Sequence, residues 1–110
     1  MQTIDRSTLK SWLDERRNVV LVEVLGPDKF QDFHLPGAVN VPVGDNNFDQ
    51  AIAQLVPDRN QAVVVYCYDT DCTASPKAAE RMEAIGYEQV FDYEAGKMDW
   101  KNAGLPIVEQ

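Results

Sequence analysis

The 110-residue sequence predicts an α/β domain in which helices cover both faces of a mainly parallel central sheet. Short runs of β-branched residues alternate with helical patterns about four times along the chain. The run Val19–Val24 is nearly continuously apolar, as is typical of a strand that is buried on both faces. No repeat, low-complexity tract or linker composition divides the sequence, so we treat residues 1–110 as a single domain.

The N-terminal part of the chain predicts one helix followed by one strand. Ser7 is the expected N-cap of the helix. Apolar residues then recur at helical spacing: Leu9, Trp12 and Leu13. The run Val19–Val24 predicts a strand, which ends before the loop signal Gly26-Pro27.

The middle of the chain predicts two helices and a second strand. Phe30–His34 is expected to form a short helix, and a turn at Leu35–Gly37 leads into a strand over Ala38–Val41. Phe48–Leu55 places its apolar residues on one helical face, and Pro57 ends that helix.

The C-terminal half carries the clearest strand and the clearest helix. Ala62–Tyr66 predicts the strand, and Ser75-Pro76 predicts the N-cap and first position of the helix. Gly86 is expected just beyond the end of that helix. A short strand over Gln89–Tyr93 and a short helix over Met98–Ala103 complete the pattern. The buried face of the long helix consists of Ala78, Ala79, Met82 and Ile85.

The charge balance argues against two classes of partner. Ten basic and 18 acidic residues give a net charge of −8, so nucleic acid and anionic membrane surfaces would repel the protein. The longest uncharged apolar stretch, residues 62–68, is far shorter than a membrane span. Because no signal peptide is visible and the two cysteines make no disulfide framework, we expect a cytoplasmic protein.

An acidic cluster accompanies the last predicted strand. It consists of Asp92, Glu94 and Asp99. We interpret the cluster first as a solvated surface, and second as a docking face for a basic partner.

The segment from Cys67 to Pro76 joins the clearest strand to the clearest helix. In parallel sheets, binding sites gather at the carboxyl ends of strands, which is where Cys67 lies. The N-terminus of the following helix favours a thiolate, and a thiolate is a nucleophile. Asp69 and Asp71 oppose that effect. The alternative is that Cys67 is simply a small hydrophobic residue of the core.

Four ordered motifs between residues 20 and 108 resemble rhodanese-like domains. The segment Leu35–Pro42, preceded by His34, is similar to the family's Pro-Gly turn and following strand. The strand that ends at Cys67 is similar to the one that leads to the family's catalytic cysteine. The remaining matches are Lys77-Ala78-Ala79 with Gly86-Tyr87 and Val90, and Ala95-Gly96 with Trp100 and Gly104–Ile107.

This resemblance implies a rhodanese-like fold and a single-domain sulfurtransferase. Cys67 would take a sulfane sulfur from a donor, hold it as a persulfide, and pass it to a thiophilic acceptor. The donor and the acceptor, each a small molecule or a protein, are the implied partners. The backbone amides of the active-site loop would surround the persulfide. That loop consists of Tyr68, Asp69, Thr70, Asp71, Cys72 and Thr73.

Cys72 is a candidate resolving residue. With four residues between the cysteines, a disulfide with Cys67 is geometrically accessible if the loop folds back. Cys72 would then displace sulfur from Cys67. The alternative is a small surface or capping residue. Cys67, Cys72 and His34 provide only three zinc ligands at awkward spacing, so we expect no metal and no cofactor.

The sequence departs from the family pattern in its charges. The loop has no Arg or Lys before Lys77, is about two residues longer than the common form, and carries two aspartates. Glu23-Val24-Leu25 replaces the usual Asp-Val-Arg. We therefore expect a persulfide, polysulfide or protein donor rather than thiosulfate. The rival interpretation is a catalytically idle rhodanese-fold module for binding or redox sensing.

Overall fold

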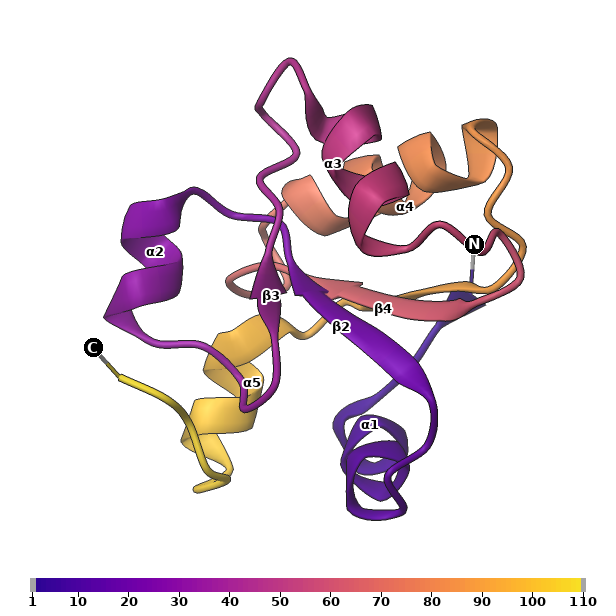
Figure 1. The fold of residues 1–110 in the computed structure, drawn as a ribbon. Coiled ribbons are helices and arrows are strands. Elements are labelled where there is room, and N and C mark those ends of the chain that lie inside the picture. Colours follow the sequence, from indigo (N-terminus) through magenta and orange to yellow (C-terminus); the bar gives the residue numbers. More distant parts are fainter. Residues whose placement is uncertain (1, 110) are drawn as a thin grey trace.

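The computed structural model describes residues 2–109 and contains a five-stranded parallel sheet with the order β1-β5-β4-β2-β3 (Figure 1). The strands are β1 (Gln2–Thr3), β2 (Val19–Glu23), β3 (Val39–Asn40), β4 (Ala62–Tyr66) and β5 (Val90–Tyr93). The helices are α1 (Arg6–Asp14), α2 (Pro27–Asp32), α3 (Phe48–Leu55), α4 (Ala74–Ala84) and α5 (Gly96–Asn102). The predicted α/β class and its parallel sheet are confirmed.

Strand β4 lies at the centre of the sheet. It pairs over its full length with β2, from Val19 opposite Ala62 to Glu23 opposite Tyr66, and on its other side with β5. Its last four residues are buried because helices cover both faces. This burial explains why the segment is continuously apolar and why its bounds match the prediction.

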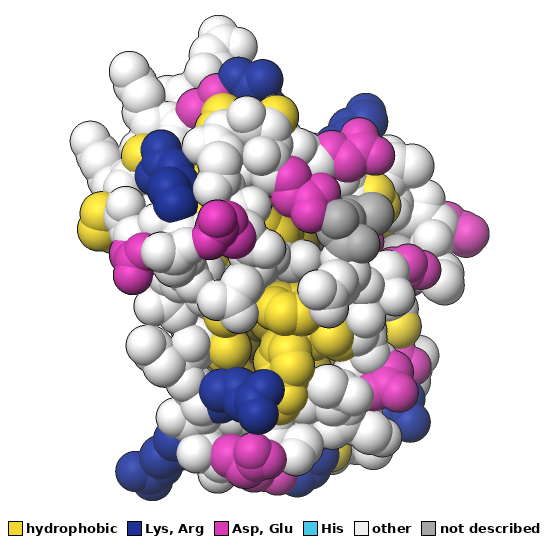
Figure 2. Space-filling model, turned by 90° about the vertical axis from the view of Figure 1, so that its right-hand side faces the viewer, with side chains coloured by type: hydrophobic (Ala, Val, Ile, Leu, Met, Phe, Trp, Pro, Cys, Tyr) yellow, Lys and Arg dark blue, Asp and Glu magenta, His cyan; other side chains and the backbone are white. Residues whose placement is uncertain are grey.

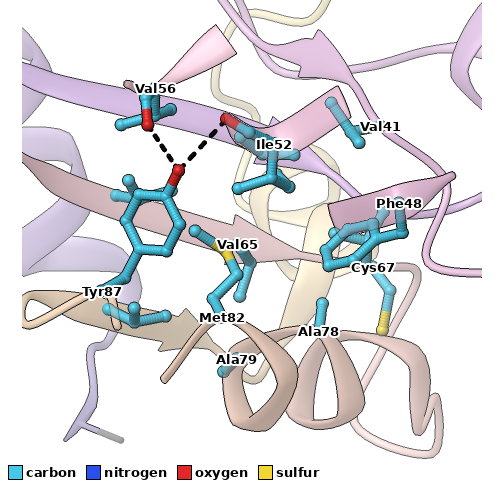
Figure 3. Packing of buried hydrophobic residues seen from close by; sticks show 14 residues of the cluster. Val41, Phe48, Ile52, Val56, Val65, Cys67, Ala78, Ala79, Met82 and Tyr87 are labelled. Carbon is cyan, nitrogen blue, oxygen red and sulfur yellow. Dashed lines mark hydrogen bonds between the residues drawn. The ribbon is translucent and has the colours of Figure 1, made fainter. Parts of the chain in front are cut away.

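Two apolar clusters flank the sheet. One joins β4 to α3 and α4, and the other joins it to α1 and α5. In the first cluster, the Tyr87 hydroxyl reaches the carbonyl oxygens of Ile52 and Val56 and thereby ties the end of α4 to α3 (Figure 3). The two clusters confirm that helices cover both faces.

Two predicted N-caps are wrong. Helix α1 is capped by Asp5, whose Oδ1 accepts a 2.8 Å hydrogen bond from the Thr8 amide, so Ser7 lies inside the helix. Helix α4 begins at Ala74 after Thr73, so Ser75 and Pro76 lie within its first turn. Proline is tolerated there because the first amides of a helix have no intrahelical acceptor. The Ser75 side chain is consequently free for another contact.

Other predicted bounds shift by a few residues. Helix α2 begins at Pro27, which occupies its first turn, rather than at Phe30. Strand β3 has two residues instead of four, and helix α5 begins at Gly96 rather than at Met98. Strand β1 was not predicted, because its two residues are too few to show a pattern. Gly86 follows helix α4 with a φ of 105°, as expected for a residue beyond a helix end.

A hollow opens at the amino ends of the strands, opposite Cys67. Figure 2, which faces this side, shows hydrophobic side chains lining it. The cavity measures about 360 Å³, and its lining includes Trp12, Val19, Ala62 and Phe91. No helix within residues 2–109 is both long and apolar enough to cross a membrane.

Candidate active site

Cys67 lies immediately after strand β4, between the sheet and the first turns of α4 (Figure 3). Only 1% of the residue is exposed, and it packs within the apolar cluster on the α4 side. Its sulfur is bonded to that of Cys72, with the two Cα atoms 6.4 Å apart. The structure therefore brings the two cysteines together, as their spacing allowed. The disulfide form contains no free thiol.

The loop folds back because a tight turn connects the two cysteines. The Cys72 amide donates to the Asp69 carbonyl oxygen at 3.1 Å, and the Asp71 amide donates to Asp69 Oδ1 at 3.1 Å. Cys72 is partly exposed, whereas Cys67 is buried. An external thiol would therefore reach the Cys72 sulfur first. The Asp71 and Cys72 amides, two of those expected to surround a persulfide, thus donate hydrogen bonds within the loop instead.

Ser75 faces the buried sulfur rather than capping the helix. Its Oγ lies 3.4 Å from Cys67 Sγ, and 1% of the residue is exposed. Because α4 begins two residues earlier than predicted, its first turn carries Ser75 over the sheet. The sequence showed this residue only as a capping signal.

The predicted solvated acidic cluster is wrong for Asp92. This residue is fully buried on β5, directly opposite Val65 of β4. Burial raises the pKa of the Asp92 carboxyl, the Ser75 hydroxyl opposes the shift, and the Glu94 charge adds to it. Asp99 is also engaged, since it accepts hydrogen bonds from Arg6 at 2.8 Å and from the Tyr93 hydroxyl at 2.7 Å. Only Glu94 matches the expected exposed surface.

Helix α5 supports the other side of the loop. The Lys97 amide donates to the Cys67 carbonyl oxygen at 3.0 Å, and the Met98 amide donates to that of Tyr68 at 2.9 Å. Gly96 makes this approach feasible, because a Cβ there would lie 2.5 Å from the Tyr68 carbonyl carbon. Its φ of 76° also favours glycine. The start of α5 is thus packed directly against the peptide that follows Cys67.

A buried ion pair connects α5 to the end of β2. Lys97 Nζ lies 3.1 Å from Glu23 Oε2 and also donates to the carbonyl oxygens of Lys29 and Phe33, at 2.6 Å each. Burial raises the pKa of the Glu23 carboxyl and lowers that of the Lys97 ammonium, while their mutual contact opposes both shifts. Sequence reasoning missed this pair. The available signal was a charged residue at the end of an apolar strand.

His34 has a structural role in this fold. It is buried and stacks on Phe30, and its Nδ1 lies 2.8 Å from the Phe30 carbonyl oxygen.

A positive charge lies close to the active-site loop, since Lys29 Nζ is 6.0 Å from the centre of the exposed Tyr68 ring. The loop is therefore acidic, with one lysine of α2 beside it.

The sequence comparison agrees with this architecture. The family model for rhodanese-like domains matches residues 5–103. The chain belongs to the rhodanese-like domain family. This membership confirms the resemblance that the four sequence motifs indicated.

Several relatives of this rhodanese-like domain are sulfurtransferases. Thiosulfate sulfurtransferase PspE of Escherichia coli is 35% identical over 88 residues, which are 80% of this chain and 77% of PspE. The HTH-type transcriptional regulator Rv0324 of Mycobacterium tuberculosis is 34% identical over 95 residues, 86% of this chain and 40% of the regulator. This chain spans about half the length of the first curated relatives it matches.

Solved structures show the same fold. The thiosulfate sulfurtransferase of Pseudomonas aeruginosa has a TM-score of 0.86 at 23% identity, covering 99% of this chain and 20% of that one. At this identity, the likeness shows the shared rhodanese fold alone.

Proposed function

We propose that this rhodanese-like domain is a sulfurtransferase that carries sulfane sulfur as a persulfide on Cys67. The observation that carries the proposal is the position of Cys67, at the carboxyl end of the central strand and beside the first turns of α4. The sulfurtransferases among its relatives support the same activity. The disulfide is the resting oxidised form, and reduction by a thiol frees the nucleophile. A cytoplasmic location, expected from the sequence, would supply such thiols.

Sulfur transfer begins from the reduced pair. The Cys67 thiolate attacks the outer sulfur of a donor persulfide, R–S–SH, forming Cys67–S–SH and releasing R–S⁻. A thiophilic acceptor then removes the outer sulfur and restores the thiol. Alternatively, the Cys72 thiolate attacks Cys67 Sγ, which releases HS⁻ and forms the disulfide. Cys72 thus acts as the resolving residue.

The charges around the loop favour a persulfide, polysulfide or protein donor over thiosulfate. Asp69 and Asp71 belong to the active-site loop, and Glu94 lines the cavity beside Cys72. The segment 67–76 contains no Arg or Lys. Each close solvated carboxylate repels each negative charge of the donor by about 1 kcal/mol, so a dianion is repelled by about 2 kcal/mol per carboxylate. Lys29 beside Tyr68 offsets only part of this repulsion.

Intact-mass spectrometry tests the proposal on protein that has first been reduced and freed of reductant. The Cys72→Ser variant, which cannot resolve, should gain one sulfur atom from a low-molecular-weight persulfide and gain it more slowly from thiosulfate. The Cys67→Ser variant is the matched control and should gain none. Wild type should return to the disulfide form while releasing sulfide.

A different result would favour the rival function. If Cys72→Ser gains no sulfur from either donor, the sulfurtransferase proposal fails. The disulfide would then favour a redox-sensing module, whose two cysteines only form and break their bond.

A further inference from the structure

Asp92 is a buried carboxyl group without a hydrogen-bonded partner. It is 0% exposed, and neither of its side-chain oxygens has a hydrogen-bond partner within residues 2–109. Leaving such a group unpaired in the interior is costly, and nearly all buried polar groups are paired. Packing alone would be better served by an apolar side chain at this position. Packing therefore does not explain why a carboxyl group is buried at position 92, which suggests a chemical role for it.

The carboxyl group lies next to the two cysteines. Asp92 lines a cavity of about 180 Å³ with Thr70, Cys72, Ser75, Pro76 and Glu94. Its strand register places it opposite Val65, on the same face of the sheet as Cys67, because alternate residues of a strand share a face. Ser75 lines the same cavity, and its Oγ is 3.4 Å from Cys67 Sγ. A carboxyl, a hydroxyl and a sulfur thus converge beneath the loop.

We propose that Asp92, acting through Ser75, is the proton relay that opens and closes the Cys67–Cys72 disulfide. The proposal deepens the proposed function, because it concerns the step that frees Cys67 and the step that follows its oxidation. It does not require that Cys67 accept sulfur.

Opening the disulfide needs a proton for the buried leaving sulfur. An external thiolate attacks the partly exposed Cys72 sulfur, the sulfur–sulfur bond breaks, and its electron pair goes to Cys67. Ser75, whose Oγ already lies 3.4 Å from Cys67 Sγ, passes its hydroxyl proton to Cys67. It takes the proton of the Asp92 carboxylic acid through a hydrogen bond that the disulfide form does not contain and that forms as the disulfide opens. The products are a mixed disulfide on Cys72, a Cys67 thiol and an Asp92 carboxylate. In reverse, the carboxylate withdraws that proton and restores the nucleophilic thiolate.

The surroundings suit Asp92 for this transfer. Burial raises the pKa of its carboxyl, so the acid persists to a higher pH than in a solvated aspartate. The Glu94 carboxylate acts in the same direction, and the Ser75 hydroxyl acts against it. Asp92 pairs with Val65 of β4 on one side and with Thr3 of β1 on the other, and neither residue has a titratable side chain. The remaining polar side chains of the cavity belong to Thr70 and Cys72.

The rate of disulfide reduction by dithiothreitol tests the relay without any sulfur donor. The reductant is added to the oxidised form of wild type, Asp92→Asn and Ser75→Ala. Samples taken over time are quenched with acid and alkylated, and their intact mass gives the fraction in which the disulfide is open. Glu80→Gln, which removes an exposed carboxylate from α4, is the control. Dividing each wild-type rate by the variant rate at the same pH cancels the titration of the reductant.

We expect both relay variants to open at least about tenfold more slowly than wild type at about pH 6. The ratio should approach one near about pH 9, where a thiolate leaves without a proton, and the control should match wild type throughout. A ratio that stays constant with pH would make Asp92 structural and overturn the proposal, as would unchanged rates. If Asp92→Asn fails to fold, Ser75→Ala decides alone, because it interrupts the relay while keeping the carboxyl. The sulfur-loading result is independent of this assay, so either proposal can fail separately.

Discussion

The contact between Gly96 and the active-site loop predicts a large effect of adding one methyl group. In Gly96→Ala, the new Cβ would lie 2.5 Å from the carbonyl carbon of Tyr68 and 2.6 Å from the Asp69 nitrogen. Both atoms are backbone, so no side-chain rotation relieves the overlap. The peptide that follows Cys67 must therefore move, or helix α5 must.

Gly104 provides a matched control. Its φ is 77°, almost the same as the 76° of Gly96, but a Cβ at Gly104 would meet nothing within 4 Å. Gly104→Ala therefore carries only the left-handed backbone cost, about 1–2 kcal/mol. Gly96→Ala carries this cost plus the overlap, which adds about 1–3 kcal/mol if it resembles an overpacked core. A domain of this size is stable by roughly 5–15 kcal/mol, so the difference is measurable.

Urea unfolding of the two oxidised variants and of wild type measures the difference in the free energy of unfolding. We expect Gly96→Ala to be the less stable variant by about 1–3 kcal/mol, with an unchanged urea dependence. Its disulfide should also be reduced at an altered rate, because the displaced peptide begins at Cys67, whereas Gly104→Ala should match wild type. Equal stabilities of the two variants would refute the reasoning that α5 braces the loop.

Two further predictions concern charge. Lys97→Met should lower the free energy of unfolding by about 3–5 kcal/mol because it leaves Glu23 buried and unpaired, and adding Glu23→Gln should recover much of the loss in urea unfolding. An equal loss in the double variant would contradict the ion-pair explanation. Asp5→Ala should destabilise α1 at neutral pH, because the cap hydrogen bond lowers the pKa of Asp5 below 3.8. The difference in stability between wild type and Asp5→Ala is present above pH 3.8 and should vanish as the pH falls through the lowered pKa of Asp5. Thermal unfolding at a series of pH values measures it. A difference that does not change with pH would rule out the charged cap.

Hydrophobic periodicity, together with the positions of proline and glycine, predicted much of the fold. The bounds of β4 and α3 match the predicted ones, because a buried strand and an amphipathic helix each leave a local pattern. Caps were less predictable. Asp5, Ser7 and Ser75 can all cap helices, and the choice among them depends on where the chain enters each helix.

The sequence by itself determined the α/β class, the position of Cys67 at the carboxyl end of the clearest strand, and the presence of Cys72 within reach. These are local properties, because strand, loop and helix signals lie within about ten residues of one another. Net charge and the loop aspartates likewise follow from composition.

Only the tertiary structure decided which charged groups are buried and what they meet. Lys97 and Glu23 are 74 positions apart, and Asp92 lies beneath the loop that follows the neighbouring strand β4. Local patterns contain no information about such partners, so Asp92 was expected at a solvated surface. Parallel pairing of β4 with β5 and the early start of α4 place it beside Ser75 instead. The chemistry around Cys67 thus depends on contacts that exist only once the sheet and its helices have assembled.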